Sequence, residues 1–179
     1  DILLYQKSSK LIKKKQMIKA DVLITNRDWK KLIKTPHLYI NKKLKKIDKK
    51  TKLFKNNNCI FTLLLSGDSE IKKLNIKFRK INKTTDILSF PFYEKKPLIK
   101  LLKNKKNKIY LGDTIINLNK IKKKNIDESF YLIFDKIWIH GLVHLLGYRH
   151  KSNLDFSIMK KIEKKLLKII KKYDLKFFL

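Results

Sequence analysis

Three of the four histidines of this chain stand close together, at His140, His144 and His150. His140 and His144 are one helical turn apart, so their rings would project from the same face of a helix. Gly147 would end that helix and let the chain turn His150 back toward the same point. Three nitrogen ligands leave one position of a zinc ion free for water, which then becomes a nucleophile near neutral pH. The pattern therefore predicts one catalytic zinc per chain.

The spacing H-x-x-x-H-x-x-G-x-x-H also matches the ligands of metzincin peptidases, so a zincin-like metal helix is expected. Those peptidases carry a glutamate directly after the first histidine as general base, whereas this chain has Gly141. A metallopeptidase would therefore lack the group that activates its water. Another alternative is a basic RNA-binding or ribosome-associated factor whose zinc is structural, which would need a fourth ligand. His37 and Cys59 are the remaining candidates for that ligand.

The segment 140–150 resembles a signature of the YbeY family of bacterial rRNA maturation endoribonucleases, H-G-x-x-H-L-x-G-Y-D-H. Further segments upstream are similar to family motifs in the same order. They are residues 74–79 (LNIKFR), 84–91 (TTDILSFP) and 111–116 (LGDTII), which resemble L-N-x-x-(Y/F)-R, T-(D/N)-V-L-S-F-P and L-G-D-I-x-I. The resemblance spans about residues 60–170, and the first 55 residues match only in general pattern.

The resemblance implies a fold, an activity and partners. The fold would be α/β (α+β), a mixed sheet flanked by helices with the zinc-binding helix at its centre. The activity would be a zinc-dependent endoribonuclease that cleaves single-stranded RNA in the cytoplasm. It would act in rRNA maturation, at the 3′ end of 16S rRNA, and in ribosome quality control. Its partners would be rRNA and the ribosome or its small subunit.

The resemblance also gives Arg79 a role, because it matches the family's functional arginine near the metal. A guanidinium can hold a phosphate through two parallel hydrogen bonds and can offset the charge that develops during hydrolysis. Arg79 is therefore the candidate catalytic residue beside the three metal ligands.

One position departs from the family signature. The usual aspartate before the last histidine is Arg149 here, so a carboxylate that could orient a ligand is absent at that position. Asp86, Asp113 and Asp155 are possible substitutes, and the sequence does not choose among them.

The chain is strongly basic, with a net charge of +31 and 46 Lys and Arg residues, of which only Arg27, Arg79 and Arg149 are arginine. Such a charge attracts polyanions, RNA among them. The lysines are scattered along the chain, however, so most are expected to be solvated surface residues. With 43% hydrophobic residues the chain is too apolar to be intrinsically disordered. Its 179 residues are expected to fold as a single domain, 1–179, around one core.

Cys59 is the only cysteine, so no intramolecular disulfide is possible and a reducing, cytoplasmic setting is expected. The N-terminal residues lack the pattern of a signal segment. The long apolar stretch 130–148 contains Asp135 and Lys136, which would be costly in lipid. It is therefore predicted to be a buried helix of a protein without a membrane partner. The oligomeric state stays open.

Apolar runs bounded by turn residues predict strands, at residues 2–6, 59–66, 87–92 and 109–118. Pro91 places the third of these at an edge of the sheet. Apolar spacing and capping residues predict helices, from Asn26 or Asp28 to Pro36, from Asp68 or Ser69 to about Asn82, from Asp127 or Ser129 to Gly147, and over 154–173. The lysine-rich run 93–108 is expected to be an exposed loop.

Overall fold

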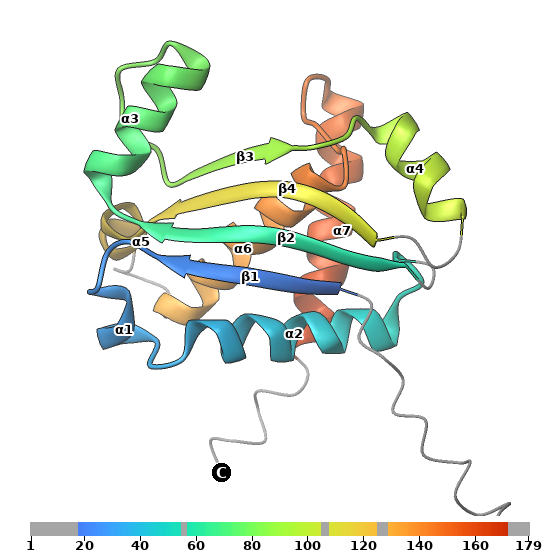
Figure 1. Cartoon of the computed structure of the whole chain (residues 1–179), viewed down its shortest axis with the longest axis horizontal. Coiled ribbons are helices and arrows are strands. Elements are labelled where there is room, and N and C mark those ends of the chain that lie inside the picture. Colours follow the sequence, from blue (N-terminus) through green and yellow to red (C-terminus); the bar gives the residue numbers. More distant parts are fainter. Residues whose placement is uncertain (1–17, 55–56, 105–107, 125–128, 172–179) are drawn as a thin grey trace, which may run out of the picture.

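The computed structural model describes residues 18–54, 57–104, 108–124 and 129–171, and the expected strand at 2–6 lies outside them. Four strands form one sheet, β1 (Ile18–Ile24), β2 (Asn58–Ser66), β3 (Ile87–Pro91) and β4 (Lys108–Asn117). Their order is β1-β2-β4-β3 (Figure 1). β1, β2 and β4 are parallel, and β3 runs antiparallel to β4. The expected mixed sheet is confirmed, and so is the edge position of the proline-containing strand.

Helices lie on both faces of this sheet, but not equally. They are α1 (Trp29–Leu32), α2 (Pro36–Lys50), α3 (Asp68–Arg79), α4 (Lys95–Lys103), α5 (Leu118–Lys124), α6 (Phe130–Leu145) and α7 (Asn153–Lys171). α2, α6 and α7 cover one face together and enclose the main core (Figure 1). α3 covers a small second cluster of Ile71, Leu88 and Ile115. The expected α/β class is confirmed.

Alternation along β2 explains how one strand serves both faces. Cys59, Phe61, Leu63 and Leu65 are buried and join the main core. The intervening Leu64 points to the other face and packs against the smaller cluster under α3. The prediction that Cys59 is a core residue is confirmed.

The central helix α6 forms as its sequence predicts. Ser129 is its N-cap, and the Ser129 hydroxyl accepts a hydrogen bond from the Leu132 amide at 3.3 Å. Most of its residues are buried, because it lies between the sheet and the other helices. Gly147 follows its end with a φ of 82°, the left-handed conformation that closes many helices. Both the start at Ser129 and the stop at Gly147 are confirmed.

A buried polar group joins α6 to α2. The Lys43 ammonium contacts the Asp135 carboxylate, which also accepts from the Tyr39 hydroxyl at 3.0 Å and from Trp138 Nε1 at 2.9 Å. Burial raises the pKa of Asp135, and the adjacent Lys43 opposes this effect. The Asp135 charge that the sequence places in this apolar helix is therefore paired inside the protein, whereas the neighbouring Lys136 is exposed.

Several expected boundaries are wrong, each for a physical reason. Pro36 begins the helix α2 and does not end the one before it, because the first helical position needs no amide hydrogen. α4 occupies the middle of the expected 93–108 loop, where Leu98 and Leu102, one turn apart, are both buried. The N-cap of α3 is Gly67, not Asp68 or Ser69, and no side chain caps it. β1, α2 and α5 were not expected at all.

Candidate metal centre

The three clustered histidines converge on one point. His140 and His144 come from the last turns of α6 and are half-buried, and the exposed His150 comes from the segment between α6 and α7. One ring nitrogen from each lies within 4.8 Å of those of the other two. The structure thus brings together all three residues that the spacing singled out.

Hydrogen bonds at Nδ1, on the side away from the shared point, fix the orientation of two of these rings. The His144 Nδ1 lies 2.9 Å from the Tyr148 carbonyl oxygen, and the His140 Nδ1 lies 2.7 Å from Glu163 Oε1. A carbonyl oxygen and a carboxylate only accept, so both histidines donate from Nδ1, and in the neutral ring this leaves Nε2 with a free lone pair. This tautomer is the one that binds a metal through Nε2.

The two free Nε2 atoms face each other at 3.0 Å. Two lone pairs so placed repel unless a cation lies between them, and two ligands of a tetrahedral zinc at about 2.0–2.1 Å lie roughly 3.3 Å apart. Burial lowers the pKa of His144, which favours the neutral ring that a metal needs. The donor set and its spacing therefore fit a zinc ion.

No fourth side chain joins this group among the residues that the structure describes. Cys59 is buried in the core, where burial raises the pKa of its thiol to about 12. His37 lies exposed on α2, next to Asn41. The two candidates for a fourth ligand are thus outside the site, and the group has three donors.

Glu163 is a residue of the site that the sequence reading missed. It lies on α7, half-buried, and it supplies a carboxylate to a metal-facing histidine. The three expected substitutes for the family aspartate make other hydrogen bonds. Asp113 accepts from the Tyr110 hydroxyl, Asp155 pairs with Ser152, and Asp86 accepts from the Thr85 hydroxyl. The sequence shows Glu163 between two pairs of lysines, but periodicity by itself does not mark such a residue as functional.

Gly141 is the residue that the packing of α6 requires. A Cβ atom there would lie 2.7 Å from Thr114 Cγ2 and 2.8 Å from Ile87 Cδ1, both on the sheet. At these distances the Thr114 and Ile87 side chains, or α6 itself, would have to shift. The glutamate that a peptidase of this spacing would carry therefore does not fit next to His140 without such a shift.

Arg79 and the three histidines line the same cavity, of about 540 Å³. Arg79 is the last residue of α3 and is exposed. Lys80 follows in the left-handed conformation. The Asn75 side-chain amide donates a hydrogen bond to the Lys83 carbonyl at 2.8 Å, so the chain turns sharply here toward β3. Arg149 also lines this cavity. Two guanidinium groups therefore share one space with the metal-capable histidines.

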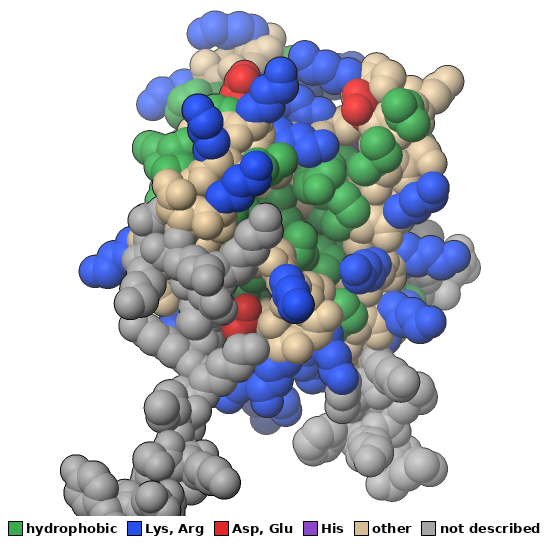
Figure 2. All heavy atoms as spheres, turned by 90° about the vertical axis from the view of Figure 1, so that its right-hand side faces the viewer, with side chains coloured by type: hydrophobic (Ala, Val, Ile, Leu, Met, Phe, Trp, Pro, Cys, Tyr) green, Lys and Arg blue, Asp and Glu red, His purple; other side chains and the backbone are tan. Residues whose placement is uncertain are grey.

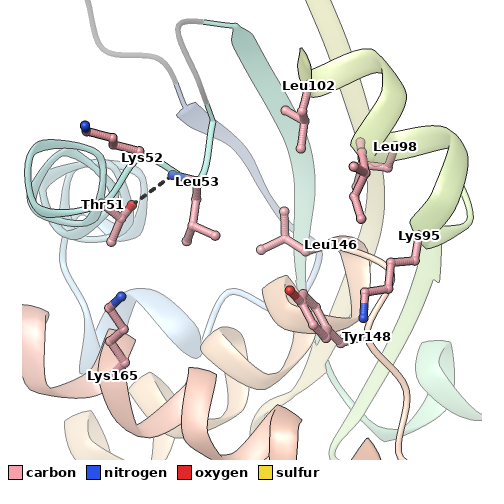
Figure 3. Close-up of a pocket in the computed structure, with 10 residues that line it drawn as sticks. Thr51, Lys52, Leu53, Lys95, Leu98, Leu102, Leu146, Tyr148 and Lys165 are labelled. Carbon is pink, nitrogen blue, oxygen red and sulfur yellow. Dashed lines mark hydrogen bonds between the residues drawn. The ribbon is translucent and has the colours of Figure 1, made fainter.

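A smaller cavity of about 320 Å³ is lined by residues of α4, of the turn after α6 and of the segment after α2 (Figure 3). Its apolar side chains include Leu98 and Leu146, and lysines stand around the apolar area on this face (Figures 2 and 3). Lys95 Nζ lies 4.3 Å from the centre of the Tyr148 ring. Gly147 is so close to α4 that a Cβ atom would lie 2.6 Å from the Lys95 Cα. α4 thus supports the turn that carries His150.

The fold and this centre define the class of protein: a mixed α/β sheet with a metal-capable group of three histidines, two on its central helix and one on the segment that follows it. The described helices contain none that is long and apolar enough to span a bilayer. A solution structure of a protein from Thermotoga maritima has a similar fold, with a TM-score of 0.56, 24% identity, and coverage of 86% of this chain and 89% of that one.

Family comparison gives the particular group. Residues 23–171 match the family model described as Endoribonuclease YbeY. The Endoribonuclease YbeY of Pelagibacter ubique is 43% identical over 158 residues, which are 87% of this chain and 97% of that protein. That of Thermodesulfovibrio yellowstonii is 37% identical over 130 residues, 69% of this chain and 77% of that protein. The chain belongs to the YbeY family of endoribonucleases.

Proposed function

We propose that this protein is a zinc-dependent endoribonuclease that cleaves single-stranded RNA. The observation that carries the proposal is the shared cavity, where three histidine donors face the same space as Arg79. Family membership supports the substrate class, since the relatives are named endoribonucleases.

His140, His144 and His150 would hold the zinc through ring nitrogens. Bound zinc lowers the pKa of a coordinated water, which makes it a nucleophile at neutral pH. Glu163 would keep His140 oriented and strengthen its donor nitrogen, and the Tyr148 carbonyl would do the same for His144. The protein thus holds two of the three ligands in their binding tautomer before the metal arrives.

Arg79 would hold the phosphate that is cleaved. Attack of water on phosphorus places extra negative charge on the phosphoryl oxygens while the bond to the leaving ribose oxygen breaks. A guanidinium within the same cavity can receive two of these oxygens at once. Arg149, in the same cavity, is a second cation that can contact the phosphate or its neighbour.

The biological setting proposed here is rRNA maturation. The RNA would be the 3′ end of 16S rRNA, the partner the ribosome or its small subunit, the location the cytoplasm, and the same activity would serve ribosome quality control. The whole chain, 1–179, would act as one domain.

The two alternatives are less well supported. A peptidase would lack a base at Gly141, where a side chain does not fit without a shift of its neighbours. A structural zinc would need a fourth ligand, and neither Cys59 in the core nor His37 on α2 belongs to the histidine group. We expect His37→Ala and Cys59→Ala proteins to keep the zinc content of the parent.

The proposal is tested by incubating purified zinc-loaded protein with an end-labelled unstructured RNA, a hairpin RNA and casein. We expect cleavage of the unstructured RNA only, its loss with a chelator, and its return when zinc is added back. RNA cleavage that a chelator leaves unchanged would contradict the role of the metal. Cleavage of casein without cleavage of RNA would favour the peptidase.

A further inference from the structure

A second and larger cavity, of about 1190 Å³, borders the metal centre on the side of α7. It lies between α6 and α7, and both His140 and its partner Glu163 line it. Asp86, Ile87 and His140 border this cavity and the Arg79 cavity alike. The two cavities therefore meet at His140, and a chain molecule lying in one can continue into the other.

Lysines dominate the walls of this larger cavity. They are Lys136 from α6 and Lys160, Lys161, Lys164, Lys168 and Lys171 from α7, all exposed. The described acidic residues in the lining are Asp86 and Glu163, and Glu163 is already bonded to His140. The excess of positive charge suits a polyanion.

The lysines of α7 form a line. Lys160, Lys164, Lys168 and Lys171 follow one another at intervals of three or four residues, so they share one face of the helix. At 1.5 Å per residue this line is roughly 16 Å long. It is long enough for contacts with several successive phosphates of an extended strand.

The floor of the cavity is apolar, formed by Ile87, Ile137 and Leu167. Such a floor can contact ribose and base edges, but it offers no hydrogen bonds for reading them. The described lining residues include no Phe, Tyr or Trp, so the base stacking on these side chains that many single-strand binders use is not provided here. The cavity therefore suits a nucleic-acid backbone of any sequence.

We propose that the groove between α6 and α7, defined by these lining residues, binds the arm of a single-stranded RNA that extends away from the cleaved phosphate. Lys160, Lys164 and Lys168 contact its phosphates and lead the strand over His140 to Arg79. This inference rests on the proposed ribonuclease function for the direction of the strand, and on charge and shape for the binding itself. It gives a specific task to part of the chain's lysine set.

The test compares two triple variants that remove the same charge. Lys160→Gln/Lys164→Gln/Lys168→Gln changes the groove, and Lys45→Gln/Lys49→Gln/Lys50→Gln changes exposed lysines of α2 outside its lining. Binding of a labelled twelve-nucleotide oligouridylate is measured by anisotropy on metal-free protein across a salt series. Cleavage of this RNA and of a trinucleotide is measured on zinc-loaded protein.

We expect the groove variant to bind the long RNA about thirtyfold more weakly, with a salt slope smaller by about 2, which is three contacts at roughly 0.7 each. Trinucleotide cleavage should stay at the parent rate, because so short a substrate reaches only the metal and Arg79. The α2 variant should change binding less than about twofold, with the parent's salt slope. The single variant Lys164→Gln should show about a third of the change in salt slope. It replaces the triple variant in the test if the triple variant does not fold.

Equal losses of RNA binding in the two triple variants would contradict the proposed groove and indicate general attraction of RNA to a basic surface. An unchanged salt slope in the groove variant would do the same. Failure of the ribonuclease function looks different, because the parent would then cleave neither RNA while the two variants still differed in binding.

Discussion

The candidate site has two halves that are held in different ways. On one side, α6 and the turn after it supply three histidines from one short segment, and Glu163 and the Tyr148 carbonyl fix two of them from behind. On the other side, Arg79 stands exposed at the end of α3, and its position depends on the turn at Lys80. The first half is pre-organised for a metal, and the second is an adaptable cation on a surface.

This difference predicts different effects of substitutions in the two halves. A three-donor site has no spare ligand, so a change in the histidines should remove the metal and with it all activity. A change in Arg79 should leave the metal in place and slow the reaction by a measurable factor. The substitutions below separate these two outcomes.

The largest effect is expected from the histidines themselves. His140→Ala or His144→Ala should weaken zinc binding by more than roughly a hundredfold. Even the loss of a hydrogen-bond partner of a metal ligand lowers metal affinity about 10- to 100-fold. Zinc per chain, measured after dialysis against a weak chelator, should fall from about one to near zero, and RNA cleavage should be lost with it. The matched control is His37→Ala on α2. A His144→Ala protein that kept a full zinc complement would disprove this ligand set.

Arg79→Ala comes next. Zinc content and thermal stability should stay those of the parent, while RNA cleavage slows about a hundredfold, the usual scale for one lost contact to a developing charge. Arg79→Lys should recover part of the rate, since an ammonium keeps the charge but not the two-point fork.

Lys77→Ala is the control for Arg79, because Lys77 is an exposed cation of the same helix outside the cavity lining. It should cleave at the parent rate. If Arg79→Ala did so too, the phosphate contact would have to be assigned elsewhere, first to Arg149.

The smallest effect is expected from Glu163→Gln. The amide can still accept the hydrogen bond from His140 Nδ1, but it no longer strengthens the ring as a donor through its charge. Zinc affinity should fall about tenfold, and cleavage at saturating zinc should be close to that of the parent. Asp155→Asn is the control on the same helix, because Asp155 pairs with Ser152 and not with a histidine. A loss of rate at saturating zinc with unchanged affinity would show that Glu163 acts in the reaction instead.

Much of the metal half could be predicted from the sequence, because its contacts are local. Helical spacing alone places His140 and His144 on one face, and Gly147 marks where the helix must stop. The buried strand β2, the central helix α6 and the amphipathic helix α7 follow from patterns of the same short range.

Contacts between residues far apart in the sequence are set by the tertiary structure alone. Glu163 reaches His140 only because α7 packs beside α6, and Arg79 shares the histidines' cavity only because α3 ends beside β3. The run that forms α4 resembles a loop in sequence, and it is helical because Leu98 and Leu102 pack into the main core. Sequence periodicity reports which face of an element is apolar, whereas partners depend on how those faces pack against one another, and that is settled by the fold as a whole.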